Sequence, residues 1–103
     1  MTTVDLCALD ELEPGSARRF DVAGARLTVV RLGDDVYVIG DRCTHQDVSL
    51  SEGEVDPDAC TIECWKHGSQ FDLRTGKPLS LPATKPAPVY DVRVVDGRVL
   101  VEV

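Results

Sequence analysis

The hydrophobic and polar positions of this chain alternate in short runs, which is the pattern of β-strands. Ala25 to Leu32 (ARLTVVRL) is rich in β-branched residues and ends at Gly33-Asp34-Asp35, and Val36 to Ile39 follows at once. These two runs predict a hairpin. Ala59 to Glu63 is a third candidate strand. No stretch longer than the turn at Asp10 to Leu12 shows a 3.6-residue period, so no helix is predicted.

A second hairpin is predicted near the end of the chain. Val89 to Val95 alternates, Asp96-Gly97 is a pair that favours a two-residue type I′ turn, and Arg98 to Val103 returns. Val92 and Val94 share one face of the first strand. Val99, Val101 and Val103 share one face of the second. Many short strands with frequent turns predict an all-β fold, a small antiparallel β-sandwich or barrel.

Three segments depart from the strand pattern: Asp41 to Leu50, Cys64 to Gly68, and the proline-rich Pro78 to Pro88. Loops held by a rigid strand scaffold often carry the functional side chains. We therefore expect the chemistry of this protein to lie in these loops.

Composition narrows the possible partners and the compartment. The net charge is −7, so nucleic acid is not expected as a partner, because phosphate binding needs a basic patch. No apolar run approaches the ~20 residues that span a bilayer, and Met1 to Ala8 has no signal-peptide pattern. We therefore expect a cytoplasmic protein. In that compartment four cysteines indicate metal or redox chemistry rather than disulfides.

Both histidines of the chain lie close to a cysteine, in Cys43-Thr44-His45 and Cys64-Trp65-Lys66-His67. Two such pairs on two loops can close around one metal centre. A tetrahedral zinc site and a Rieske cluster both use two cysteines and two histidines. Each loop here supplies one ligand of each kind, with cysteine first, which favours a two-iron cluster over a classical zinc finger.

These residues resemble the Rieske ferredoxin family, the small electron carriers of bacterial aromatic-ring dioxygenases. Cys43, His45, Cys64 and His67 match the family's ligand pattern, with a slightly longer spacer between the pairs, and further matches are Gly68, Phe71-Asp72 and Thr75-Gly76. The resemblance implies a single Rieske domain over residues 1–103. It also implies two cluster-binding loops and a proline-containing cover loop, for which Pro78 to Pro82 is the candidate.

The resemblance implies a function as well. The chain would hold one Rieske [2Fe–2S] cluster and act as a soluble one-electron carrier. It would pass electrons from a flavin-dependent ferredoxin reductase to a terminal non-heme iron oxygenase. It would not itself be an enzyme, because the sequence ends at Val103 without an oxygenase domain. A monomer is expected, since a carrier must leave each partner quickly.

Two other functions remain open at this point. A Rieske ferredoxin could instead serve iron–sulfur cluster assembly or another redox system. A structural zinc-binding module is the third possibility.

Two features bear on the reduction potential that the resemblance implies. Val48 and Lys66 stand where high-potential Rieske proteins carry a pair of disulfide-bonded cysteines, so this chain resembles the low-potential branch. Ser69 occupies the position of a hydroxyl that hydrogen-bonds a cluster sulfur in high-potential members, whereas Phe71 replaces their tyrosine. We predict a potential of roughly −150 mV, raised somewhat by Ser69. A simple turn role for Ser69 is the alternative.

The other residues near the motif have less specific roles. Cys7 and Cys60 are expected to be buried thiols that are neither ligands nor disulfide-bonded. Trp65, between two predicted ligands, would either contact a partner or shield the cluster from water.

Overall fold

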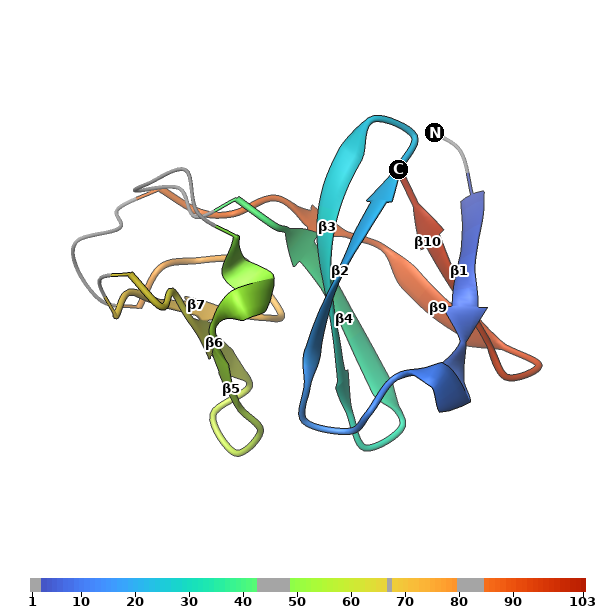
Figure 1. Cartoon of the computed structure of the whole chain (residues 1–103), viewed down its shortest axis with the longest axis horizontal. Coiled ribbons are helices and arrows are strands. Elements are labelled where there is room, and N and C mark those ends of the chain that lie inside the picture. Colours follow the sequence, from blue (N-terminus) through green and yellow to red (C-terminus); the bar gives the residue numbers. More distant parts are fainter. Residues whose placement is uncertain (1–2, 43–48, 67, 80–84) are drawn as a thin grey trace.

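The structure is a computed structural model that describes residues 3–42, 49–66, 68–79 and 85–103. Its strands form three antiparallel sheets arranged side by side (Figure 1). The first contains β1 (Thr3–Ala8), β10 (Arg98–Glu102) and β9 (Val92–Val95), in that order. The second runs β2 (Ala17–Val22), β3 (Ala25–Leu32), β4 (Asp35–Gly40) and β8 (Val89–Tyr90). The third contains β5 (Glu54–Asp56), β6 (Thr61–Glu63) and β7 (Gln70–Asp72).

Helical structure in the described ranges is limited to two short 3-10 turns, η1 (Leu9–Glu11) and η2 (Leu50–Glu52). The prediction of an all-β fold is therefore confirmed. None of the helical turns in this part of the chain is long and apolar enough to cross a membrane.

The middle of β3 in the second sheet is buried on both faces, because this sheet lies between the other two (Figure 1). Successive residues of a strand point to opposite faces. Leu27 and Val29 accordingly join a core with Val99 and Val101 of β10, whereas Val30 joins a second core beside the third sheet. This double burial explains the nearly continuous apolar run of β3, since a strand exposed on one face would alternate.

The second core carries the third sheet. It contains buried side chains from β6, β7 and the segments around them: Leu50, Cys60, Ile62, Cys64, Phe71, Leu73 and Ala87. These side chains pack against Val30 and Ile39 of the second sheet. The small sheet is thereby fixed to the rest of the protein by apolar packing.

The predicted C-terminal hairpin is confirmed, with one interruption. Asp96 and Gly97 have φ angles of 50° and 75°, as a type I′ turn requires. The predicted strand Val89 to Val95 is divided at Asp91, where the chain passes from the second sheet to the first. Strand β8 pairs with Val38 and Ile39 of β4. After Asp91 the chain continues as β9 in the first sheet, so β4 and β9 diverge from there.

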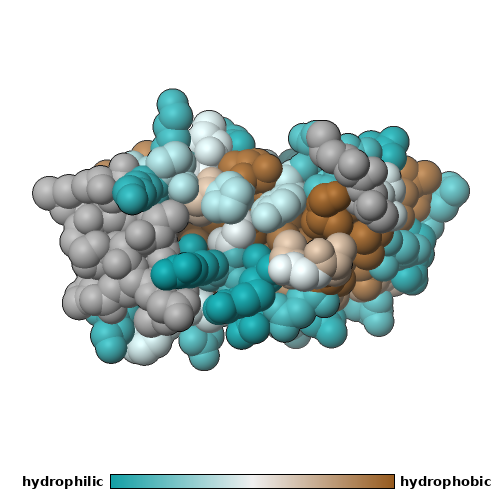
Figure 2. All heavy atoms as spheres, turned by 90° about the horizontal axis from the view of Figure 1, so that it is seen from above, coloured by the Kyte–Doolittle hydropathy of each residue, from teal (hydrophilic) through white to brown (hydrophobic). Residues whose placement is uncertain are grey.

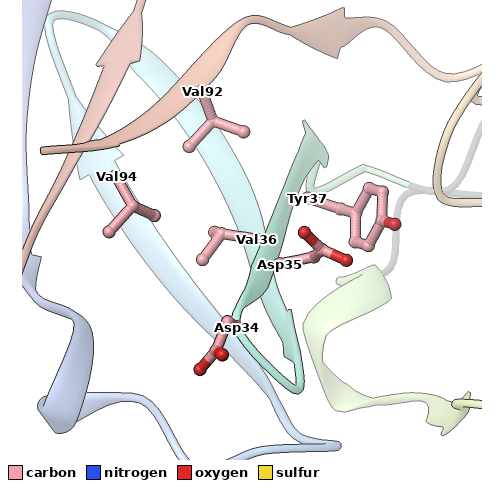
Figure 3. Close-up of a pocket in the computed structure, with 6 residues that line it drawn as sticks. All are labelled: Asp34, Asp35, Val36, Tyr37, Val92 and Val94. Atoms are coloured by element: carbon pink, nitrogen blue, oxygen red, sulfur yellow. The ribbon is translucent and has the colours of Figure 1, made fainter.

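A cavity of about 310 Å³ lies where β4 and β9 diverge. In Figure 3, Val36, Val92 and Val94 face one another across it, Asp34 lies at the turn before β4, and Asp35 lies beside Tyr37. Its lining contains neither cysteine nor histidine, so it is not a candidate for the predicted metal centre.

The prediction for Ala59 to Glu63 was wrong at its start. Strand β6 begins at Thr61, whereas Ala59 and Cys60 belong to the turn that follows β5. Cys60 has a φ of 57°, which a residue within a strand does not adopt. The hairpin predicted from Ala25 to Ile39 is confirmed by the pairing of β3 with β4.

The surface agrees with the acidic, polar composition. On the face shown in Figure 2, hydrophilic side chains cover most of the coloured area and hydrophobic ones gather in smaller patches. Large apolar side chains exposed by about half include Trp65 and Leu79, which both lie in the predicted cluster-binding and cover segments.

Candidate metal centre

The second predicted ligand loop is closed by its own backbone. It joins β6 to β7, whose register pairs Glu63 with Gln70. The Cys64 amide donates to the Ser69 carbonyl at 2.7 Å, and the Gly68 amide donates to the Cys64 carbonyl at 2.9 Å. Gly68 has a φ of 76°, a conformation that favours glycine. The loop thus places Cys64 at the end of a strand, with its side chain only 1 % exposed.

The first predicted ligand loop has a neck that is also closed. Arg42 and Ser49 form an isolated antiparallel bridge, and the Leu50 amide donates to the Asp41 carbonyl at 2.5 Å. The Asp41 amide in turn donates to the Arg26 carbonyl at 3.0 Å. Arg42 and Ser49, the described residues on either side of 43–48, therefore lie side by side.

The carboxylate of Asp41 holds this neck together. It is fully buried, and it accepts hydrogen bonds from the Thr28 hydroxyl at 2.7 Å, the Ser51 amide at 3.0 Å and the Ser49 hydroxyl. Arg19 and Arg26 each approach it to 3.7 Å. Burial by itself raises the pKa of Asp41, but these hydrogen bonds outweigh burial and hold the pKa below its usual value.

The two necks are packed against each other. Leu50, just after the first neck, is fully buried in the same core as Cys64. Gly53 passes so close to the second neck that a Cβ atom there would lie 1.7 Å from the Glu63 carbonyl oxygen. Only glycine permits this approach, and it brings the bases of both predicted ligand loops together.

The third segment is hydrogen-bonded to β7 at its start and to the turn after β7 at its return. Pro78 forms an isolated bridge with Phe71, and the Leu79 amide donates to the Gln70 carbonyl at 2.7 Å. At the return, the Ala87 amide donates to the Gly76 carbonyl at 2.7 Å. The proposed cover loop, Pro78 to Pro82, thus begins beside β7. Residues 80–84 are outside the described residues.

Of the four predicted ligands, the structure describes Cys64. Cys43, His45 and His67 lie outside the described residues, and among the residues that it does describe no group of three or more His, Cys, Asp or Glu is arranged to hold a metal ion. The described part nevertheless fits an iron–sulfur cluster. A buried cysteine at the base of a closed loop, in apolar surroundings, is the environment in which a thiolate ligand is kept from solvent.

Cys7 and Cys60 are buried and not disulfide-bonded, as predicted. They belong to different cores, on opposite sides of the second sheet. Cys60 lies at the end of β6 opposite Cys64, so the extended chain between them separates the two by about 13 Å. It is hydrogen-bonded to Tyr37, whose pKa is raised by burial and by this contact. Cys60 is therefore not placed to share a metal with Cys64.

The residues that follow Cys64 in the chain differ in their exposure to solvent. Ser69 and Phe71 are fully buried, whereas the Trp65 side chain is 52 % exposed. The Lys66 ammonium lies 5.7 Å from the centre of the Trp65 ring, within range of a cation–π interaction. Trp65 thus faces solvent on the outside of the loop, where a partner protein can reach it.

Sequence reasoning missed the residues that support the loops. Asp41, Leu50 and Gly53 carry no metal-binding motif, and their roles depend on partners far away in the chain, such as Thr28 and Glu63. The nearest sequence signal was the position of Asp41 at the junction of a strand and a ligand pair.

Comparison with known proteins identifies the family. The model of the Rieske [2Fe–2S] domain matches residues 2–91. Ferredoxin CarAc of Metapseudomonas resinovorans is 45 % identical over 93 % of this chain and 89 % of its own length. The ferredoxin subunit of 3-phenylpropionate/cinnamic acid dioxygenase of Escherichia coli (strain K12) is 37 % identical over 99 % of this chain and 94 % of its own.

Solved structures agree with this assignment. The ferredoxin of carbazole 1,9a-dioxygenase from Nocardioides aromaticivorans IC177 superposes with a TM-score of 0.95, at 42 % identity over 98 % of this chain and 97 % of that one. A ferredoxin at 44 % identity and a TM-score of 0.87, covering 96 % of this chain and 91 % of its own, was solved as oxidised ferredoxin with the reduced oxygenase of a carbazole 1,9a-dioxygenase.

These relatives are electron-carrying subunits rather than enzymes in their own right, and the present chain is a ferredoxin of the same dioxygenase-system type. Its cofactor is a Rieske [2Fe–2S] cluster. On the family match and the fold together, the chain belongs to the family of Rieske [2Fe–2S] domains.

Proposed function

We propose that this chain accepts one electron from a flavin-dependent reductase and delivers it to the terminal non-heme iron oxygenase of a multicomponent dioxygenase. The observation that carries the proposal is the similarity, over nearly the whole chain, to a ferredoxin that was solved in complex with its oxygenase. The reductase as donor is the sequence-based expectation. The cytoplasm, where both partners would be found, is the expected compartment.

We propose Cys43 and Cys64 as the ligands of one iron, and His45 and His67 as the ligands of the other. The closed necks at Asp41 and Cys64 support this assignment, because they bring the bases of the two loops together. When bound, the cluster supplies reversible one-electron chemistry. Residues 1–103 would form one domain around it.

The surrounding residues have separate tasks in this proposal. The buried apolar core around Leu50 and Phe71 excludes water from the protein side of the centre. Ser69, which is fully buried, would donate a hydrogen bond to the cluster that favours the reduced state. Trp65 and Lys66, on the exposed side of the second loop, provide contact surface for a partner.

A reconstituted electron-transfer assay tests the proposal. NADH, a ferredoxin reductase and the oxygenase of carbazole 1,9a-dioxygenase from Nocardioides aromaticivorans IC177 would be combined with carbazole, with and without this protein. We expect product only when the protein is present, in proportion to its concentration. If the cluster-loaded protein is reduced but yields no product with this oxygenase or with the 3-phenylpropionate enzyme, the proposal is wrong.

A further inference from the structure

A buried carboxylate lies two residues before the first predicted ligand. Asp41 is fully buried, although aspartate is almost never buried completely unless its charge is paired. It directly follows β4, at the neck that Arg42 forms on the way to Cys43. Covalent geometry limits the separation of the Asp41 and Cys43 α-carbons to about 7 Å. A charge on Asp41 therefore lies close to any cluster that Cys43 binds.

Three hydrogen-bond donors surround the Asp41 carboxylate. Its Oδ1 accepts from the Thr28 hydroxyl at 2.7 Å and from the Ser51 amide at 3.0 Å, and its Oδ2 accepts from the Ser49 hydroxyl. Hydrogen bonds to an ionised carboxylate are stronger than those between neutral groups, and they favour the charged form. Because the donors come from β3, the neck and η2, they hold the charge at one place in the fold.

The two arginines beside Asp41 lie nearer to solvent than the carboxylate. The guanidiniums of Arg19 and Arg26 each approach its Oδ2 to 3.7 Å. Their side chains are 43 % and 42 % exposed, whereas the Asp41 side chain is fully buried. Water and salt screen an exposed charge more than a buried one. Whatever the arginines add, the contribution of the carboxylate itself is negative and acts inside the protein.

Stability of the neck does not by itself explain a charge at this position. Neutral groups of similar size are often as good as a buried ion pair for the stability of a fold. The amide oxygen of an asparagine could also accept hydrogen bonds from Thr28 and Ser51. What asparagine would lack is the negative charge of Asp41. The group beside the neck that responds to charge is the cluster, because it changes its own charge during electron transfer.

We infer that Asp41 lowers the reduction potential of the cluster, by holding a buried negative charge beside the ligand pair that begins at Cys43. Reduction adds one electron, and with it one negative charge, to the cluster. A fixed carboxylate makes this step less favourable, because like charges repel most strongly where water is excluded. A lower potential makes the ferredoxin a stronger donor to its electron acceptor. The inference rests on the proposed assignment of Cys43 as a ligand.

Asp41→Asn tests the inference, because it removes the charge and preserves the size of the side chain. The reduction potential of the holoprotein would be measured by protein-film voltammetry. We expect reduction to become about tenfold more favourable, which for one electron is a rise of about 59 mV. Asp34→Asn is the matched control, since it removes the same charge from a side chain that is 97 % exposed in the turn before β4. It should change the equilibrium by less than about twofold.

Thr28→Val separates the charge of Asp41 from a merely structural role. This variant removes one hydrogen bond to the carboxylate and leaves its charge in place. If the potential depended only on a tight neck, Thr28→Val and Asp41→Asn would shift it in the same direction. We expect Thr28→Val to leave the potential unchanged or to lower it. The electron paramagnetic resonance spectrum of the reduced cluster should stay the same in both variants, since the ligands do not change.

Two results would overturn the inference. The potential of Asp41→Asn could equal that of wild type, or an equal rise could occur in Asp34→Asn or in Thr28→Val. The visible spectrum and iron content show that each variant has kept its cluster.

A second pair of variants decides the question if Asp41→Asn does not bind the cluster. Arg19→Gln and Arg18→Gln remove the same charge from neighbouring residues of β2, where side chains alternate between faces. Arg19 approaches Asp41, whereas Arg18 lies over the Phe20 ring. A lower potential in Arg19→Gln than in Arg18→Gln supports the inference, because the negative charge of Asp41 is then less compensated. Equal potentials in the two variants overturn it.

Cys43→Ser distinguishes failure of this inference from failure of the proposed ligand. If Cys43→Ser keeps the visible absorption and the iron, the ligand assignment fails and the inference fails with it. If Cys43→Ser loses the cluster while Asp41→Asn leaves the potential unchanged, the inference fails alone. Voltammetry needs no partner protein, so the result for Asp41 is independent of whether the oxygenase accepts electrons from this ferredoxin.

Discussion

Cys64 and Cys60 stand at opposite ends of the same short strand, β6, and both are nearly buried. They therefore offer a matched pair for testing the ligand assignment. We expect Cys64→Ser to abolish the visible absorption of the cluster, because it removes a thiolate ligand. Cys60→Ser should keep the absorption and the iron content. Equal loss of iron in both variants would contradict the assignment of Cys64 as the ligand of this loop.

Ser69 is fully buried, and its carbonyl accepts the bond from Cys64 that closes the second loop. We predict that Ser69→Ala lowers the reduction potential by about 50 mV, because a hydrogen bond to the cluster favours the more negative, reduced state. Protein-film voltammetry measures the shift. An unchanged potential in a variant with an intact spectrum would mean that the hydroxyl does not reach the cluster and that Ser69 is a turn residue.

At the scale of elements, the two predicted ligand loops depend on the close approach of Gly53 to Glu63. Gly53 has a φ of −84°, so alanine there meets a steric clash and no backbone strain. We expect Gly53→Ala to lower the free energy of unfolding by about 1–3 kcal/mol and to reduce cluster occupancy, since the clash separates the necks.

Gly24→Ala is the control for that variant. Gly24 has a φ of 78° with open space around the position of a Cβ atom. Strain in the left-handed region should lower the free energy of unfolding by about 1–2 kcal/mol without loss of iron. Thermal unfolding and iron analysis of both variants make the comparison. Full iron occupancy in Gly53→Ala would show that the necks do not need this contact.

The elements differ in how far the sequence could predict them. The hairpin of β3 and β4 and the hairpin of β9 and β10 follow from local alternation and turn residues, and both were predicted. Strand β2 was not, because its two arginines obscure the alternation, and the Ala23-Gly24 turn after it has an alanine at a φ of 49°. The division at Asp91 depends on a change of sheet that no local signal records.

The site shows the same contrast. The candidate ligands can be recognised in the sequence from their spacing, because metal ligands must be cysteine, histidine or another residue type that can bind the metal. The supporting residues are ordinary in type and are recognisable only from long-range contacts, as between Asp41 and Thr28. Three of the four predicted ligands lie outside the described residues, and the role of all four as ligands stays a prediction.

At the scale of the whole molecule, we expect both cores to stabilise the fold and only the core beside the small sheet to retain the cluster. Leu50 belongs to the core beside the small sheet and Leu27 to the core between the other two sheets, and both are fully buried. Each leucine-to-alanine change should lower the free energy of unfolding by about 2–5 kcal/mol. We predict that Leu50→Ala also loses iron from the folded protein, whereas Leu27→Ala keeps it.

Denaturant unfolding monitored by far-ultraviolet circular dichroism, together with cluster absorption, distinguishes these effects. Parallel loss of iron in both variants would contradict a division of labour between the cores. It would indicate instead that cluster retention follows global stability.

The most direct test of the central claim is the visible absorption spectrum of the anaerobically purified protein, before and after dithionite, together with its iron and zinc content. A Rieske [2Fe–2S] carrier should contain about two iron atoms per chain and show broad visible bands that bleach on reduction. A colourless protein that contains zinc and no iron, even after iron-replete expression, would contradict the account.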